Sequence, residues 1–94
     1  MTNQKTLVEK IDVLIDKSNY KATSTKYKFL YEHCSIMLTK LKAAVLNNSL
    51  NAAQPETTDI SLFLVHRLES RDIAFTHEIS QVNSEVEKYF NISD

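Results

Sequence analysis

The 94-residue sequence has no glycine, one proline and one cysteine. Folds rich in β-strands use glycine where a turn needs a positive φ angle, so its absence argues against an all-β or doubly wound fold. It also excludes the glycine-rich loops that bind nucleotide phosphates. A single cysteine excludes an internal disulfide bond, and because Cys34 falls on an apolar helical stripe we expect a buried, unreactive thiol.

Long hydrophobic runs are also missing, and no stretch of about 18 apolar residues could form a membrane-spanning helix. The polar N-terminus leads into a charged helix and lacks the pattern of a secretory signal peptide. We therefore expect a cytoplasmic protein that is peripheral to a membrane at most. The chain length indicates one domain over residues 1–94, which we expect to be a monomer.

The net charge of -1 is divided unequally along the chain. Residues 1–50 hold eight lysines and four acids, a formal charge of +4, whereas residues 51–94 hold three cations and eight acids, a formal charge of -5. Two interpretations remain open: the two halves attract each other across the fold, or the basic half faces an acidic surface such as a membrane. Because the lysines are interleaved with acids, we expect no binding to nucleic acid.

An apolar stripe of helical period organises the sequence and predicts a long helix over residues 25–47. The stripe residues recur at steps of one, three or four: Tyr27, Leu30, Cys34, Met37, Leu38, Leu41 and Val45. Phe29 and Ile36 lie off this stripe, and we expect them to widen the buried face against a neighbouring helix. One amphipathic helix cannot bury its own stripe, so shorter helices before and after it must cover it.

The first covering helix is predicted over residues 6–17, where Thr6 and Glu9 have the spacing of a capping box. Val13 is expected to widen its buried face. Residues 18–24 are predicted to form a loop, with Ser24 as the N-cap of the long helix. The inward residues of this first helix are Leu7, Ile11, Leu14 and Ile15.

Residues 47–54 are rich in asparagine, serine and alanine and predict a break, in which Leu50 is expected to pack under the bundle. The third helix is predicted over residues 55–71, because proline suits the first turn of a helix. Glu56 and Asp59 would then lie near the positive end of the helix dipole. Its inward residues are Ile60, Phe63, Leu64 and Leu68.

Residues 72–75 form a short link in which Ile73 and Phe75 are expected to close the end of the bundle. The fourth helix is predicted over residues 76–90, with Thr76 as its N-cap and Glu78 in its first turn. Its stripe consists of Ile79, Val82, Val86 and Phe90. Short links make successive helices alternate in direction. The sequence therefore predicts an all-α, antiparallel up-down-up-down four-helix bundle that turns on asparagine and serine instead of glycine.

No group of residues in the sequence is typical of an enzyme, and we expect no catalytic residue, metal or cofactor. The three histidines, His33, His66 and His77, fall on three different helices, and none has the partners of a metal site. The segment around His66 faintly resembles a histidine phosphotransfer domain. Those domains have a lysine and a glycine where this chain has Glu69 and Ser70. A phosphotransfer module using His66 stays as one alternative.

Residues 60–90 combine an amphipathic helix, a link that ends in Phe75, and a second helix that opens with Thr76, His77 and Glu78. This segment resembles the immunity proteins of pediocin-like (class IIa) bacteriocins, particularly the enterocin A and pediocin immunity subgroup. The matching positions are Phe75, Thr76 and Glu78. The chain length, the lack of glycine-rich turns and the lysine-rich second helix also fit this family.

The resemblance implies a cytoplasmic helical bundle from a Gram-positive bacterium that gives its host immunity to a pore-forming peptide. Family members are thought to act at the mannose phosphotransferase permease with the bacteriocin bound to it, and their specificity lies largely in the C-terminal half. We therefore predict a partner-contact cluster on the last two helices: Arg67, Arg71, Asp72, Tyr89 and Phe90. The other alternative is a helical adaptor or antitoxin-type interaction protein.

Overall fold

Four α-helices and a π-helical segment are found among residues 3–23 and 26–92, the part of the chain that the computed structural model describes. In chain order they are α1 (Gln4–Thr23), α2 (Lys28–Leu46), α3 (Leu50–Phe63), η1 (Leu64–Leu68) and α4 (Ile73–Tyr89). The same residues contain no strand. The predicted all-α fold is confirmed.

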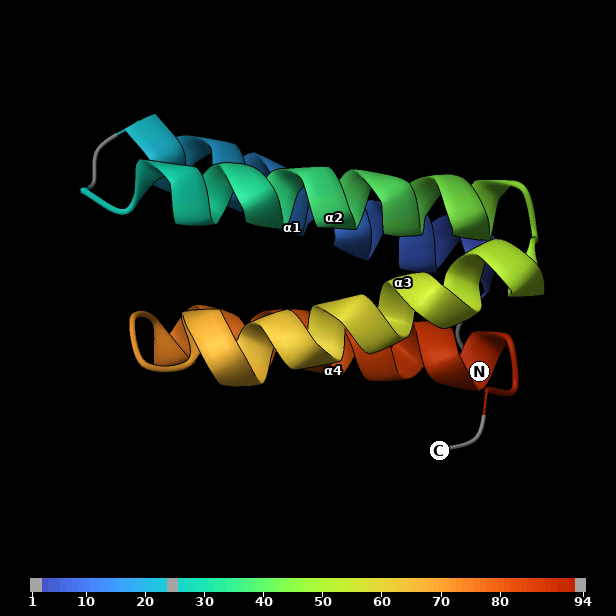
Figure 1. Ribbon diagram of the computed structural model, residues 1–94. Coiled ribbons are helices and arrows are strands. Elements are labelled where there is room, and N and C mark those ends of the chain that lie inside the picture. Colours follow the sequence, from blue (N-terminus) through green and yellow to red (C-terminus); the bar gives the residue numbers. More distant parts are fainter. Residues whose placement is uncertain (1–2, 24–25, 93–94) are drawn as a thin grey trace.

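The helices pack as two antiparallel hairpins, α1 with α2 and α3 with α4 (Figure 1). The hairpins meet where α2 packs on α3 and α1 packs on α4, which gives the predicted up-down-up-down bundle. The bundle measures 36 × 24 × 20 Å. At its left-hand end in Figure 1 lie the α1–α2 connection and the turn between η1 and α4, and we call this the loop end.

An apolar core built from the predicted stripes lies between the helices. Removing a large aliphatic or aromatic side chain from water contributes about 1.5–3 kcal/mol, so these stripes hold the two hairpins together. The large side chains with almost no exposed surface are Leu7, Ile11, Leu38, Leu41, Val45, Ile60, Leu68, Phe75 and Val86.

The first helix is longer than predicted, and the expected loop over residues 18–24 is wrong for its described part. Ser18 is buried and its hydroxyl donates to a main-chain carbonyl one turn earlier at 2.9 Å, and Ala22 is buried one turn later. These small side chains keep α1 against its neighbours after the large apolar residues end. At the N-terminus, the Asn3 side chain accepts from the N–H of Thr6 at 2.8 Å, so Asn3 has the capping role expected of Thr6.

The second helix begins at Lys28, and the residue before it, Tyr27, makes no side-chain capping bond. The predicted cap Ser24 lies outside the described residues. Phe29 and Ile36 are 83% and 55% exposed, and Val13 of α1 is also exposed, so the prediction that they widen buried faces is wrong. The helix packs on α1 and α3, and Phe29 and Ile36 face neither of them.

The third helix begins at Leu50 instead of Pro55 because Ser49 caps it, accepting from the N–H of Ala52 at 3.2 Å. Pro55 therefore lies inside the helix, where it has no N–H to donate to the carbonyl of Asn51.

Two further expectations fail because α3 starts early. Leu50 is exposed and does not pack under the bundle. Glu56 and Asp59 lie beyond the first turn, outside the reach of the positive end of the helix dipole.

The regular helix gives way to the wider π-helical turn η1 before the predicted end at residue 71. The N–H of Glu69 donates to the carbonyl of Leu64 at 2.8 Å, a spacing of five residues instead of four. A wider turn shifts the direction of every side chain that follows it. The wider turn therefore affects His66, Arg67 and the turn at residues 69–72.

The fourth helix begins at Ile73 and its N-cap is Asp72, whose carboxylate accepts from the N–H of Phe75 at 3.1 Å. Thr76 is therefore not the cap; its hydroxyl donates to the carbonyl of Asp72 at 2.9 Å. Phe75 closes the end of the core as predicted, whereas Ile73 is exposed. Glu78 lies in the second turn and not the first.

Asparagine replaces glycine in the connection between α2 and α3, as predicted. Asn48 has a φ angle of 51°, in the left-handed region that asparagine tolerates better than most residues. Asn91, just after α4, has the same conformation with a φ angle of 57°.

Ion pairs between α1 and α4 join the basic and acidic halves of the chain. Lys10 and Glu85 are 2.8 Å apart and Lys17 and Glu78 are 2.6 Å apart. A third pair, Lys21 and Asp72 at 3.0 Å, lies at the loop end. These pairs support the interpretation that the two halves attract each other, although each exposed pair contributes only about 0.2–1 kcal/mol.

Candidate binding site

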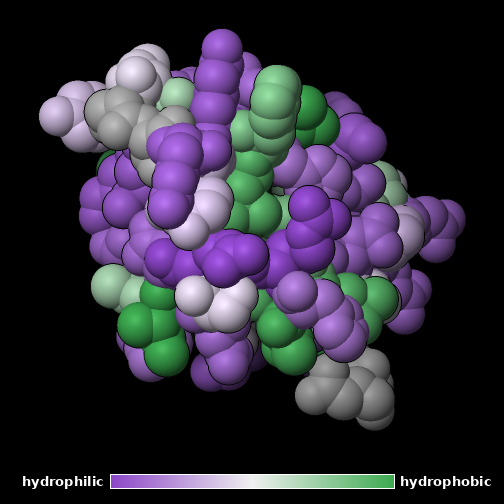
Figure 2. All heavy atoms as spheres, turned by 60° about the vertical axis from the view of Figure 1, so that its left-hand side comes forward, coloured by the Kyte–Doolittle hydropathy of each residue, from purple (hydrophilic) through white to green (hydrophobic). Residues whose placement is uncertain are grey.

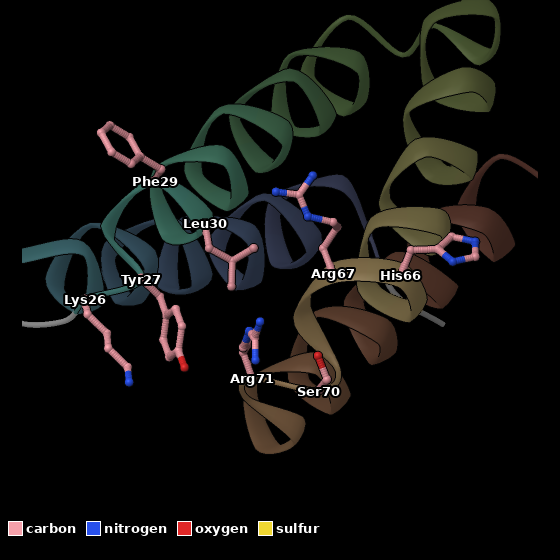
Figure 3. A pocket seen from close by; sticks show the side chains of 8 residues that line it. All are labelled: Lys26, Tyr27, Phe29, Leu30, His66, Arg67, Ser70 and Arg71. Atoms are coloured by element: carbon pink, nitrogen blue, oxygen red, sulfur yellow. The ribbon is translucent and has the colours of Figure 1, made fainter.

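A groove of about 310 Å³ lies at the loop end, between the start of α2 and the end of the third helix. One wall is the first turn of α2 with the two residues before it, and the other is η1 with the turn that follows it. The groove is lined by Lys26, Tyr27, Phe29, Leu30, His66, Arg67, Ser70 and Arg71 (Figure 3).

Tyr27 organises the charged side of this groove. The guanidinium carbon of Arg71 lies 5.3 Å from the centre of the Tyr27 ring, and the Nζ of Lys26 also lies 5.3 Å from it. Cation–π contacts at this distance hold a flexible cationic side chain near one position. Figure 3 shows Arg67 and Arg71 reaching from the end of the third helix towards the start of α2.

The lining of the groove is positively charged. Lys26, Arg67 and Arg71 contribute three cations, and none of the eight lining residues is acidic. None of these three cations forms an ion pair within the part of the chain that the structure describes. Cations that share a groove repel one another, so the arrangement favours an anionic ligand.

His66 lies at the rim of the groove and its side chain is exposed. In Figure 3 the imidazole ring points away from Tyr27 and Arg71. Glu69 and Ser70 follow it at the positions where a phosphotransfer domain has lysine and glycine. His66 therefore lacks both of the residues that a phosphotransfer domain has after its histidine.

The structure divides the predicted contact cluster between the two ends of the bundle. Arg67 and Arg71 lie in the groove at the loop end. Tyr89 and Phe90 lie at the far end of α4, about 25 Å along the helix axis. There they pack edge to face and the Tyr89 hydroxyl donates to the Asn48 side chain at 3.0 Å. The expectation of one cluster of five residues is therefore wrong.

Asp72, the fifth predicted contact residue, is used inside the fold. Its side chain is 15% exposed, and one carboxylate oxygen accepts from Lys21 at 3.0 Å and from the Tyr31 hydroxyl at 2.7 Å. Burial by itself raises the pKa of Asp72, but these two hydrogen bonds, the Phe75 N–H and the charge of Lys21 together lower it. Burial and the bond to Asp72 raise the pKa of Tyr31. This group links α1, α2 and α4, and the Asp72 carboxylate already accepts from three donors of the fold.

Sequence reasoning missed the α2 side of the groove. It assigned Tyr27 and Leu30 to the apolar stripe, where both are half-buried, and it placed Phe29 on a buried face. The signal was local: Lys26 and Lys28 alternate with Tyr27 and Phe29 around the start of the long helix, which is the pattern of an exposed basic and aromatic segment.

Two further observations concern metal-ligating residues and the thiol. The described residues contain no group of three or more His, Cys, Asp or Glu side chains that could hold a metal ion. The Cys34 thiol is buried as predicted, and burial, with a smaller contribution from the charge of Asp72, raises its pKa to about 12. A thiol with this pKa is a poor nucleophile near neutral pH.

None of the helices in the described ranges has the length and apolar character needed to cross a membrane. Comparisons of the chain with family models, with curated proteins and with solved structures gave no match.

Proposed function

We propose that this protein is a bacteriocin immunity protein, which protects a producing cell from a pediocin-like pore-forming peptide by binding and not by catalysis. The resemblance over residues 60–90 and the antiparallel four-helix bundle both support this proposal. The observation that carries it is the groove at the loop end. There Arg67 and Arg71, from the half of the chain in which the family holds its specificity, lie together with the half-buried Tyr27 and the exposed Phe29.

In this proposal the bundle docks on the cytoplasmic side of the mannose phosphotransferase permease while the bacteriocin is bound. Docking protects the cell only if the bundle binds the closed state of that assembly more tightly than the open pore. A tenfold shift towards the closed state requires about 1.4 kcal/mol of differential binding.

A protection assay tests the proposal directly. The chain is expressed in the cytoplasm of a bacteriocin-sensitive strain, which is then challenged with a panel of pediocin-like peptides. Resistance to one or a few peptides is the expected result. Sensitivity to every peptide, with the protein present and helical by circular dichroism, would refute the proposal.

The double variant Arg67→Ala with Arg71→Ala tests whether the groove is the site of action. Protection should be lost while the helical content is unchanged, because both side chains are exposed. The matched control is Lys5→Ala with Lys40→Ala, which removes the same charge from exposed positions away from the groove. Protection that survives in the arginine variant would exclude the groove.

The adaptor alternative has some support in the exposed apolar side chains of the third helix, Leu62 and Val65. It predicts a protein partner that is captured from the host regardless of bacteriocin. The phosphotransfer alternative predicts an acid-labile phosphate on His66 after incubation with an acyl-phosphate donor, and His66→Gln is its control.

A further inference from the structure

We propose that the loop end of the bundle binds the surface of a membrane that contains anionic phospholipids. A lipid phosphate would lie in the groove, and Phe29 would enter the boundary between headgroups and acyl chains. This inference goes beyond immunity and does not depend on it.

The eleven cations of the chain fall into three groups, of which one, Lys5, Lys40 and Lys88, lies away from the groove and has no ion pair among the described residues. Lys10, Lys17, Lys21 and Lys42 each pair with a carboxylate on a neighbouring helix. At the loop end, Lys26, Lys28, Arg67 and Arg71 have no acidic partner among residues 3–23 and 26–92. Glu32 and Glu69 lie on adjoining turns and do not line the groove. Three of these unpaired cations, Lys26, Arg67 and Arg71, share one groove that no acidic residue lines.

The groove suits a phosphate group. Lys26 and Arg71 are held over one aromatic ring, and Arg67 reaches in from η1. Arginine can donate two parallel hydrogen bonds to a phosphate, and the volume of about 310 Å³ is large enough for a lipid headgroup.

Exposed apolar side chains at the same end distinguish a membrane from a soluble anion. Phe29, Tyr20 and Ile73 are all more than half exposed. Figure 2, which turns this end towards the viewer, shows hydrophobic side chains among hydrophilic ones. In Figure 3 the ring of Phe29 points away from the side chains of the third helix, out of the groove.

The direction of Phe29 is what favours lipid over an acidic polypeptide. An acidic peptide in the groove would neutralise the cations but leave this ring in water. A membrane offers an anionic layer at the level of the cations and an apolar layer just beyond it. Aromatic side chains next to cations are typical of such interfaces.

Sedimentation with vesicles tests the proposal on the purified full chain. The protein should bind vesicles of phosphatidylglycerol and phosphatidylcholine in equal parts, but not vesicles of phosphatidylcholine alone, and added salt should weaken binding. Each cation near the surface contributes about a fivefold factor, so Arg67→Ala with Arg71→Ala should weaken binding about 30-fold. The control, Lys5→Ala with Lys40→Ala, should have a much smaller effect.

A tryptophan reporter tests the orientation, because the chain has no tryptophan of its own. The variant Phe29→Trp should show a blue-shifted emission on adding anionic vesicles. Leu46→Trp, at an exposed position at the far end of α2, should show none.

Three results would overturn the proposal. One is no binding to anionic vesicles, and another is equal binding to anionic and neutral vesicles. The third is a shift at position 46 without a shift at position 29. Binding of a soluble poly-glutamate peptide without vesicle binding would assign the groove to an acidic polypeptide instead.

Discussion

Replacing Asp72 with alanine should destabilise the bundle more than replacing any other acid. Its carboxylate caps α4 through the N–H of Phe75, and it accepts from Lys21 on α1 and from Tyr31 on α2. The Lys21 Nζ also lies 5.6 Å and 5.2 Å from the centres of the Tyr31 and Phe75 rings. Removing the carboxylate therefore leaves a hydroxyl and an ammonium group without their partner.

The size of this effect follows from the separate contacts. Losing an N-cap costs about 1 kcal/mol, and losing a hydrogen bond to a charged group costs about 1.5–3 kcal/mol. The Lys21 side chain is partly exposed, which places its contribution at the lower end of that range. The expected loss is about 3 kcal/mol, which would lower Tm by roughly 12–24 °C in a domain of this size.

The pH dependence isolates the charge of the carboxylate. Because the pKa of Asp72 is lower in the folded protein than in the unfolded chain, its ionised form adds stability above the ordinary aspartate pKa. That stability is lost as the pH falls below about 4 towards the lowered pKa. The stability gap between the natural protein and Asp72→Asn should therefore shrink over that range.

Urea unfolding followed by circular dichroism measures both effects. The control is Asp59→Ala, which removes an exposed acid of α3 and should change stability by less than about 0.5 kcal/mol. A loss below about 1 kcal/mol for Asp72→Ala, or a gap that stays constant from neutral to acid pH, would refute the reasoning.

Further predictions concern the proline inside α3, the buried cysteine and an ion pair between α1 and α4. Pro55→Ala should raise the free energy of unfolding by up to about 3 kcal/mol in urea titrations, because it supplies the N–H that the carbonyl of Asn51 lacks; an unchanged value would contradict this. Cys34 should react with a disulfide reagent more than about a hundredfold slower in the folded protein than in urea, and equal rates would show that it is accessible. A double-mutant cycle on Lys17 and Glu78 should give a coupling of about 0.2–1 kcal/mol that falls with salt, whereas a larger, salt-independent value would contradict an exposed pair.

The fold class could be predicted because the apolar periodicity is strong and the chain lacks glycine. The helix limits could not, because they depend on small residues with more than one possible role. The sequence pattern placed Ser18 and Ala22 in a loop, but both occupy buried, inward positions on α1. Pro55 is typical of the start of a helix. However, Ser49 caps α3 earlier in the chain, and the proline lies inside the helix.

The candidate site was predictable only in part. Arg67 and Arg71 could be selected because they are the cations near the end of the third helix. Their position beside Tyr27 depends on the contact between α2 and the third helix and on the wider turn of η1, which no local pattern in the sequence specifies. Apolar pattern also cannot distinguish a side chain that faces a neighbouring helix from one that faces water, and Phe29 is the example.

The uneven charge of the sequence allowed two interpretations, and the structure assigns them to different residues. The acids of α4 pair with Lys10, Lys17 and Lys21, which sets how α1 and α4 lie against each other. Those lysines are then neutralised by the fold itself and cannot contribute much to an external surface. Among the cations that form none of these pairs, Lys26, Arg67 and Arg71 lie together in one groove. Pairing between α1 and α4 therefore uses up Lys10, Lys17 and Lys21, whereas the three cations of the groove stay available at the loop end, where an anionic partner can meet them.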